Sequence, residues 1–139
     1  MMMLSVPRQN SLVLYKTQPA RVRRTGKKLE IELRNGDVRS VRPKDVVLLH
    51  PGPLADLGAL QPPPGEVEVA WELLAGETTT LAELAELAFD AYTPATAWAA
   101  WQLVADGLYF RGSPGEVIAA TQEEVAYQAA ARQARAEEE

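Results

Sequence analysis

Short stretches of alternating apolar and polar positions fill the first third of the chain. In residues 29–34, leucine or isoleucine stands at every second position with charged side chains between, which is the two-residue period of a half-buried β-strand. Residues 20–23 also alternate, residues 12–16 and 46–49 are short and mainly apolar, and residues 37–41 are expected to pair back on the alternating strand; turn residues separate these stretches. Asn35-Gly36 predicts a type I′ hairpin turn, because that turn requires positive φ at both central positions. Together these stretches predict a small SH3-like β-barrel in residues 1–50, with a single turn at 42–45 before its last strand.

A Pro-rich segment follows this pattern at residues 51–65. Pro-rich spacers are extended and semi-rigid, so we expect a linker between two domains here. Leu54, Leu57 and Leu60 have the spacing of one amphipathic turn, which would pack on either side.

The apolar period changes to that of helices after residue 65. The first helix is expected to end at Gly76, with an apolar stripe that consists of Val67, Val69, Ala70, Leu73 and Leu74. Thr80 and Glu83 have the spacing of a capping box, which predicts the start of a second helix that continues to Phe89.

A third helix is expected to run directly into a strand within residues 93–112. Thr93 is a good N-cap, Pro94 suits the first helical position, and Gly107 can supply a left-handed C-cap. Trp98 and Trp101 share one face of this helix, where packing in a core or an interface is expected.

Two strands and a final helix complete the pattern. Residues 108–111 and 117–120 flank a Ser-Pro-Gly turn and predict a two-stranded wing. Thr121 and Glu124 form a second capping box before the last helix. Residues 66–139 are therefore expected to form a winged helix-turn-helix module with a C-terminal helix, and the whole chain an α+β fold.

Charge divides the chain into two unlike halves. Residues 1–50 contain eleven Lys or Arg against four acids, a net charge of +7. Residues 51–139 contain three Arg against fifteen acids, a net charge of −12. Such asymmetry indicates two modules with different roles, with nucleic acid as the partner of the basic one.

Catalytic and cofactor motifs are missing from the sequence. His50 is the only histidine, and it has no serine, cysteine or aspartate arrangement around it that would make a nucleophile or a metal site. Cysteine is absent, no apolar run is long enough to span a bilayer, and no glycine-rich phosphate loop occurs. We expect a cytoplasmic chain without an active site, cofactor or membrane partner of its own.

The basic half offers candidate nucleic-acid contacts without a base-specific code. Backbone phosphates are bound by closely spaced, flexible cations, and an exposed tyrosine ring adds a stacking platform. The candidate residues are Tyr15, Arg21, Arg23, Arg24, Lys27, Lys28, Arg34, Arg39, Arg42 and Lys44. Strand alternation puts Arg21 and Arg23 on one face, which Arg34 joins only if the hairpin register permits. The alternatives are that this basic face docks on the acidic half or on a partner, or that it is only a solvated surface.

The third predicted helix is a poor candidate for DNA recognition. Between Pro94 and Asp106 there is no Lys or Arg, and only Gln102 could contact a base edge. The wing contributes Arg111 alone, in a module that carries many acids. Binding a polyanion there would cost repulsion with little counterion release.

Taken in order, these segments resemble the N-terminal region of the RNB, or ribonuclease II/R-like, exoribonucleases. The resemblance rests on the basic barrel that ends at residues 42–53, the Pro-rich spacer, and the segment 97–110 with its two tryptophans and Asp106-Gly107-Leu108-Tyr109-Phe110. It extends over about residues 11–139. In bacterial and organellar members a winged helix stands where others carry cold-shock domains.

The resemblance implies processive 3′-to-5′ hydrolysis of single-stranded RNA with Mg²⁺ held by an aspartate cluster in the RNB domain. This sequence contains neither that cluster nor an S1-type domain, so no catalytic residue transfers to it. We therefore expect an accessory, RNA-positioning front end of a larger enzyme, whose winged helix packs on the catalytic domain or a partner protein. The alternative is a winged-helix adaptor or transcriptional regulator that docks on protein or binds DNA.

Overall fold

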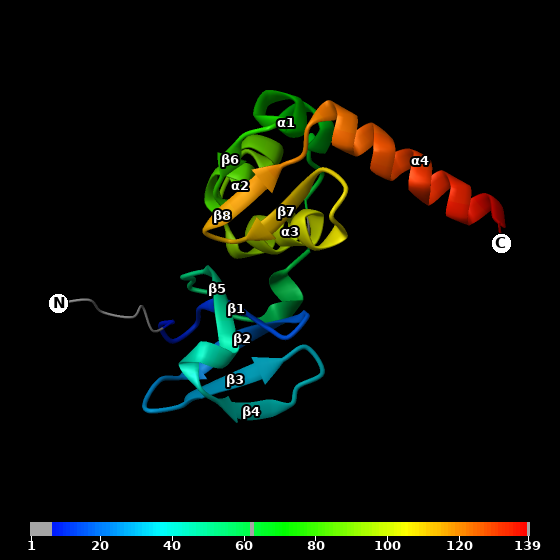
Figure 1. Cartoon of the computed structure of the whole chain (residues 1–139). Coiled ribbons are helices and arrows are strands. Elements are labelled where there is room, and N and C mark those ends of the chain that lie inside the picture. The colour runs from blue at the N-terminus through cyan, green and yellow to red at the C-terminus, as the bar shows by residue number, and fades with distance from the viewer. Residues whose placement is uncertain (1–6, 62, 139) are drawn as a thin grey trace. The chain divides into compact units, whose positions relative to one another are not determined.

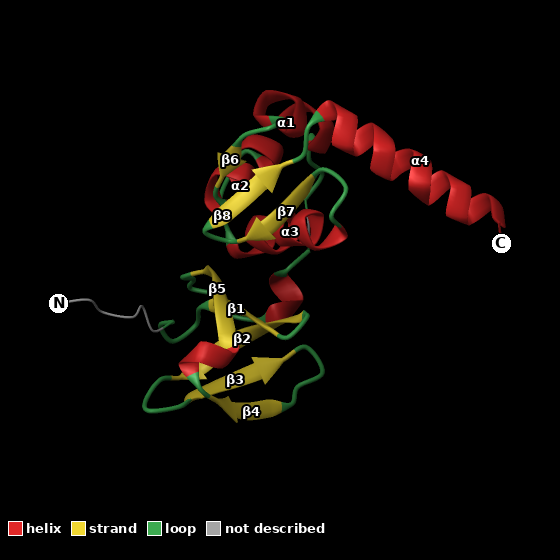
Figure 2. Ribbon diagram, viewed as in Figure 1, coloured by secondary structure: helices red, strands yellow, loops and turns green. Residues whose placement is uncertain are grey.

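The computed structural model describes residues 7–61 and 63–138 of the 139-residue chain. The chain forms two compact units (Figures 1 and 2). The first unit runs to Pro63 and includes Thr93–Trp98, and the second unit contains Pro64–Tyr92 and the residues from Ala99 onward. A β-rich unit followed by a helical one confirms the predicted α+β fold.

The first unit is built on a five-stranded antiparallel sheet with the order β4-β3-β2-β1-β5. Its elements are β1 (Leu12–Tyr15), β2 (Gln18–Arg24), β3 (Leu29–Leu33), β4 (Val38–Val41), the 3₁₀ turn η1 (Pro43–Asp45) and β5 (Val46–His50). These strands confirm the five predicted ones, with ends shifted by a residue or two. Pairing among the described residues ends at β4 and β5, so closure into an SH3-like barrel stays a prediction.

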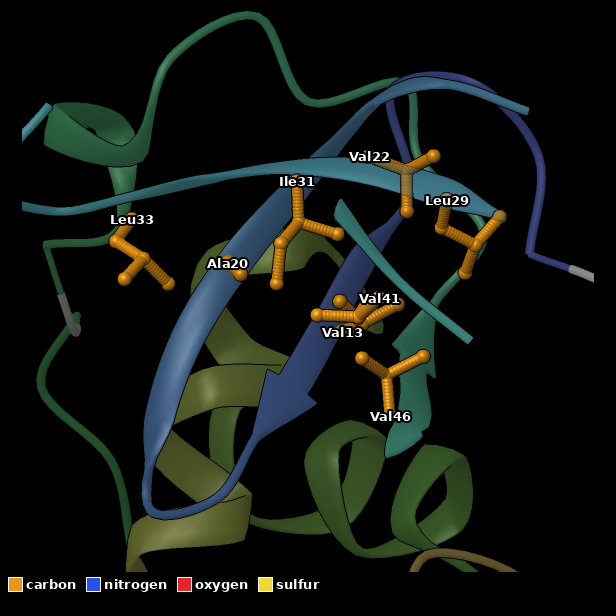
Figure 3. Packing of buried hydrophobic residues seen from close by; sticks show 8 residues of the cluster. All are labelled: Val13, Ala20, Val22, Leu29, Ile31, Leu33, Val41 and Val46. Carbon is orange, nitrogen blue, oxygen red and sulfur yellow. The ribbon is translucent and has the colours of Figure 1, made fainter. Parts of the chain in front are cut away.

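One face of this sheet forms the hydrophobic core of the first unit. Figure 3 shows its eight side chains gathered on the inner side of the strands. The cluster consists of Val13, Ala20, Val22, Leu29, Ile31, Leu33, Val41 and Val46. In β3 the core residues Leu29, Ile31 and Leu33 occupy alternate positions, as the sequence period predicted. Each fully buried aliphatic side chain contributes about 1.5–3 kcal/mol relative to exposure.

The hairpin between β3 and β4 is confirmed, but its predicted type I′ turn is wrong. Only Gly36 has a positive φ, of 91°, whereas a type I′ turn needs one at Asn35 as well. The backbone N–H of Gly36 donates to the Leu33 carbonyl at 3.0 Å, and the Leu33 N–H donates to the Asp37 carbonyl at 2.8 Å. A three-residue loop with glycine in its last position satisfies these bonds. The Asn35 side-chain oxygen accepts from the Asp37 N–H at 3.0 Å and stabilises this turn.

Residues expected to form a spacer also contribute core side chains. Leu54, Leu57 and Leu60 are 3%, 6% and 1% exposed, and the 3₁₀ turn η2 (Leu57–Ala59) contacts β2. The Leu54 N–H donates to the Asn10 carbonyl at 2.8 Å. The three leucines thus lie in an amphipathic turn, which their spacing allowed. This turn packs with the first unit.

The second unit combines four helices with a three-stranded sheet of order β6-β8-β7. Its elements are α1 (Val67–Leu74), β6 (Thr78–Thr79), α2 (Leu81–Phe89), α3 (Pro94–Asp106), β7 (Phe110–Ser113), β8 (Glu116–Ala119) and α4 (Gln122–Glu138), with residues 94–98 of α3 grouped with the first unit. The predicted helices and wing are confirmed, whereas β6 was not predicted. At Gly112 in β7, with a φ of 114°, an added Cβ would overlap the Glu116 carbonyl oxygen, so this strand position of the wing requires glycine.

The predicted apolar stripe of α1 is wrong in part. Val69 and Leu73 are 51% and 63% exposed, whereas Ala70 is buried as predicted and Val67 and Leu74 are half-buried. Trp71, which was not in the predicted stripe, is half-buried as well. The indole Nε1 of Trp71 donates to the Ala120 carbonyl at 2.7 Å. The buried and half-buried positions have the spacing of one helix face. Trp71 can lie on this face because its indole N–H has a hydrogen-bond acceptor.

Threonine caps begin the helices at the predicted positions. The Thr80 hydroxyl accepts from the Glu83 N–H at 3.2 Å at the start of α2, and the Thr93 hydroxyl accepts from the Thr96 N–H at 3.2 Å at the start of α3. Trp98 is buried and Trp101 is half-buried, in line with the packing role expected for them. Among the described residues, no helix has both the length and the apolar character needed to cross a membrane.

Candidate nucleic-acid interface

Four cations lie together around the β2–β3 hairpin. Arg23 and Arg24 end β2, and Lys27 and Lys28 stand in the loop before β3. All four are exposed, and within residues 7–61 and 63–138 none of them forms an ion pair. We call this group the hairpin cations. Exposed and unpaired guanidinium and ammonium groups at this density are what binding to a phosphate backbone requires.

Arg21 is held more firmly than the hairpin cations. Its side chain is 19% exposed, and its guanidinium donates to Asn10 Oδ1 at 2.7 Å and to Glu32 Oε1 at 3.0 Å. Its Nε is buried and has no hydrogen-bond partner in the described part of the chain. Arg21 is therefore positioned by its neighbours, with one N–H still lacking an acceptor.

A β-bulge in β2 changes the arrangement of the arginines. The register passes from Val22 opposite Ile31 to Arg24 opposite Glu30, which leaves Arg23 as the extra residue. As a result Arg21, Arg23 and Arg24 line one cleft of about 550 Å³ together with Gln9, Thr25 and Glu30. We call it the bulge cleft. Alternation predicted that Arg21 and Arg23 share a face; the bulge adds Arg24, while Arg34 is not among the lining residues.

The remaining candidate cations are spread more widely. Arg34 and Arg39 flank the β3–β4 turn, and Arg39 lies 3.9 Å from the Asp37 carboxylate. Arg42 lies 3.5 Å from Asp45, and Lys44 stands within η1. The hydrogen bond that the Arg42 backbone N–H donates to Asp45 lowers the pKa of that carboxyl, and the Arg42 charge adds to this. These exposed pairs contribute little stability and can exchange partners.

Tyr15 is less available for base stacking than its position in the sequence suggested. Its ring is half-buried against the core of the first unit, and the Lys16 ammonium lies 5.4 Å from the ring centroid. A cation over one face of the ring leaves less of it open to a base.

Sequence reasoning missed three residues of the bulge cleft. Gln9, Thr25 and Glu30 carry an amide, a hydroxyl and a carboxylate into its lining. The charge count marks the arginines, but nothing in the sequence shows that β2 bulges between Val22 and Arg24.

The surface of the second unit offers little to a polyanion. In α3, the exposed Gln102 is the only side chain of the kind that contacts base edges, and the Asp106 carboxylate pairs with Arg132 at 3.1 Å. Arg111 of the wing pairs with Glu124 at 3.2 Å. Two of the three arginines of this half are thus engaged with acids, which disfavours DNA binding by this winged helix.

The capping box at the start of α4 is complete. Glu124 Oε1 accepts from the Thr121 N–H at 2.9 Å, and the Thr121 hydroxyl accepts from the Glu124 N–H at 3.1 Å. The hydrogen bond from the Thr121 backbone lowers the pKa of Glu124 below its ordinary value of 4.5, and the Arg111 charge adds to the effect. Ionised Glu124 therefore stabilises the folded cap above its unfolded pKa, and this contribution is lost as the pH falls through the lower folded pKa.

This linkage gives a prediction for Glu124. A carboxyl NMR titration should give a pKa below 4.5, and Arg111→Ala should raise that pKa only part of the way, because the Thr121 hydrogen bond remains. A Glu124 pKa at or above 4.5 in the unsubstituted protein would contradict the capping geometry.

Metal ligands do not gather in the part of the chain that the structure describes. Within residues 7–61 and 63–138, no three His, Asp or Glu side chains lie so that they could hold a metal ion together. The described residues thus do not fit the Mg²⁺ site that a ribonuclease resemblance implies.

A basic β-sheet followed by three helices and a short β-wing places the chain in the class of winged helix proteins. The family model for the winged helix domain of ribonuclease II matches residues 61–133, which is more than half of the chain. The chain therefore belongs to the ribonuclease II winged helix domain family. No curated protein and no solved structure matches the sequence. The expected resemblance is confirmed for the winged helix, whereas the SH3-like barrel stays a prediction.

Proposed function

We propose that this chain is a non-catalytic, RNA-positioning region of a ribonuclease II-like 3′-to-5′ exoribonuclease. The observation that carries the proposal is the group of hairpin cations, exposed and without ion pairs to the residues that the structure describes, in a chain whose other unit is a ribonuclease II winged helix. Single-stranded RNA is the substrate class of such an enzyme. The cysteine-free sequence suits the cytoplasm, where we place this function.

The hairpin cations would act on the phosphate backbone and not on the bases. Each lysine or arginine that neutralises a phosphate releases condensed counterions, and this gain does not depend on base sequence. Arg34, Arg39, Arg42 and Lys44 would extend the positive field along the strand. A processive enzyme benefits from such contacts because they hold RNA near the entrance without fixing its register.

The acidic second unit would have a different role. Its half of the chain has a net charge of −12, so it repels RNA and keeps the strand on the basic sheet. Val69 and Leu73 of α1 leave apolar surface exposed, which suits packing on the catalytic domain or on a partner protein.

A pair of charge-matched triple variants tests the proposal. Replacing Arg23, Lys27 and Lys28 with alanine should weaken binding of a labelled oligouridylate by about tenfold to a hundredfold, because each exposed ion pair contributes up to about 1 kcal/mol. The salt dependence should become shallower by roughly one unit of slope for each phosphate contact removed. Fluorescence anisotropy at several salt concentrations measures both quantities.

The control removes the same charge from the other half of the chain. Arg111, Arg132 and Arg135 replaced together by alanine should leave RNA affinity within about twofold of the unsubstituted protein, since two of these arginines pair with Glu124 and Asp106. Equal losses in both triple variants would show that the hairpin cations have no special role.

A further inference from the structure

The bulge cleft is a defined concavity and not only part of a basic surface. It measures about 550 Å³ and lies where β2 gains its extra residue, Arg23. Bulges re-aim side chains, and here the bulge brings Arg23 and Arg24 to the same side as Arg21. Lys27 and Lys28 stand in the next loop but do not line the cleft.

The lining of the cleft has the chemistry of a phosphate site. It presents three guanidinium groups, the Thr25 hydroxyl and the Gln9 amide against one carboxylate, Glu30, which leaves a net charge of +2. Guanidinium groups bind phosphate oxygens through two parallel N–H donors, which a lysine ammonium cannot reproduce. The cleft is polar on nearly all sides, so it suits an oxyanion better than an apolar ligand.

Arg21 supplies the fixed part of this site. Asn10 and Glu32 hold its guanidinium in place at 2.7 and 3.0 Å, so a ligand need not order this side chain on binding. Its Nε is buried and lacks a hydrogen-bond partner in the described residues, and it belongs to a side chain that lines the cleft.

We propose that the bulge cleft binds one phosphate group of the RNA and so anchors the strand at a single point. This inference rests on the proposed function and deepens it. Lys27 and Lys28 attract the RNA backbone by their charge, with no fixed geometry. The three arginines of the cleft, in contrast, bind one phosphate by bidentate hydrogen bonds. The phosphate is either a terminal monoester or an internal diester, which share the same oxygen chemistry.

A charge-conserving substitution distinguishes specific binding of a phosphate in the cleft from general electrostatic attraction of the RNA. Arg23→Lys with Arg24→Lys keeps the net charge but removes the paired N–H donors, and we expect oligouridylate affinity in the full chain to fall by about tenfold. The matched control, Arg132→Lys with Arg135→Lys, lies on α4 outside the basic sheet and should change affinity by less than about twofold. Equal affinities for both double variants and the unsubstituted protein would overturn the inference.

Inorganic phosphate tests the cleft without RNA. The Arg21 Nε–H resonance should shift saturably as phosphate is added at constant ionic strength, and this shift should be lost in the Arg23→Lys, Arg24→Lys variant. No saturable shift, or the same shift in both proteins, would overturn the inference. If the unsubstituted chain bound no RNA yet gave the saturable shift, the proposed function would fail while the phosphate site stood.

Oligonucleotides that differ only at their ends show whether the bound phosphate is terminal or internal. Tighter binding of an oligouridylate with a 5′- or 3′-phosphate than of one with two hydroxyl ends, by about tenfold, assigns the cleft to a terminal monoester, whose second ionisation adds charge. Equal affinities, together with the tenfold loss in the lysine variant, assign it to an internal diester.

Discussion

Replacing Phe110 with alanine should lower the free energy of unfolding of the second unit by about 3–5 kcal/mol. Phe110 begins β7 and is 0% exposed, and it is among the largest fully buried side chains of the described residues. Alanine would remove an entire ring from the interior and leave a cavity that the short wing strands cannot fill. Chemical denaturation followed by tryptophan fluorescence measures the loss.

Tyr127→Ala is the matched control for this aromatic truncation. Tyr127 lies on α4 and is 75% exposed, so its removal should change the free energy of unfolding by less than about 0.5 kcal/mol. If Phe110→Ala cost no more than Tyr127→Ala, the position of β7 in the core would be wrong.

The second large effect is expected in the core of the basic sheet. Ile31 is 0% exposed at the centre of β3, and Ile31→Ala should lower the free energy of unfolding of the first unit by about 2–5 kcal/mol. RNA binding should then be lost at a lower temperature, because the hairpin cations depend on the fold of β2 and β3. Parallel thermal scans of circular dichroism and RNA anisotropy measure both transitions.

Val47→Ala provides the comparison for Ile31. Val47 is 45% exposed in β5, so its truncation should cost less than about 0.5 kcal/mol and leave the temperature of RNA release unchanged. If RNA binding in Ile31→Ala outlasted the unfolding of the first unit, the site would lie elsewhere.

Most elements of the fold could be predicted because local sequence determines them. The alternation of Leu29, Ile31 and Leu33 leaves only one register with an apolar inner face. The capping residues Thr93 and Thr121 use hydrogen bonds within three residues, so spacing alone locates the helix starts.

Features that depend on distant partners were missed. Strand β6 is two residues long and exists because Thr78 and Thr79 pair with β8, some forty residues away in the chain. The exposure of Val69 and Leu73 reflects which side of α1 faces the rest of its unit, and two apolar residues at helical spacing do not determine that side.

Part of the candidate site could likewise be predicted from the sequence, and part of it could not. Counting charges located the hairpin cations, since exposed lysines and arginines need no partner to be recognised. The cleft was not foreseeable, because it depends on one unpaired residue in β2 and on an arginine held by Asn10 and Glu32. A bulge is a property of the pairing between two strands, so the sequence of either strand alone does not predict it.

The basic sheet is proposed to bind the RNA backbone through its charges. The most direct measurement is the affinity of the unsubstituted chain for oligouridylate as a function of salt. With roughly three to six phosphate contacts, the logarithm of the binding constant should fall against the logarithm of salt with a slope of about −2 to −4. Affinity that does not change with salt, or no binding even at low salt, would contradict the account.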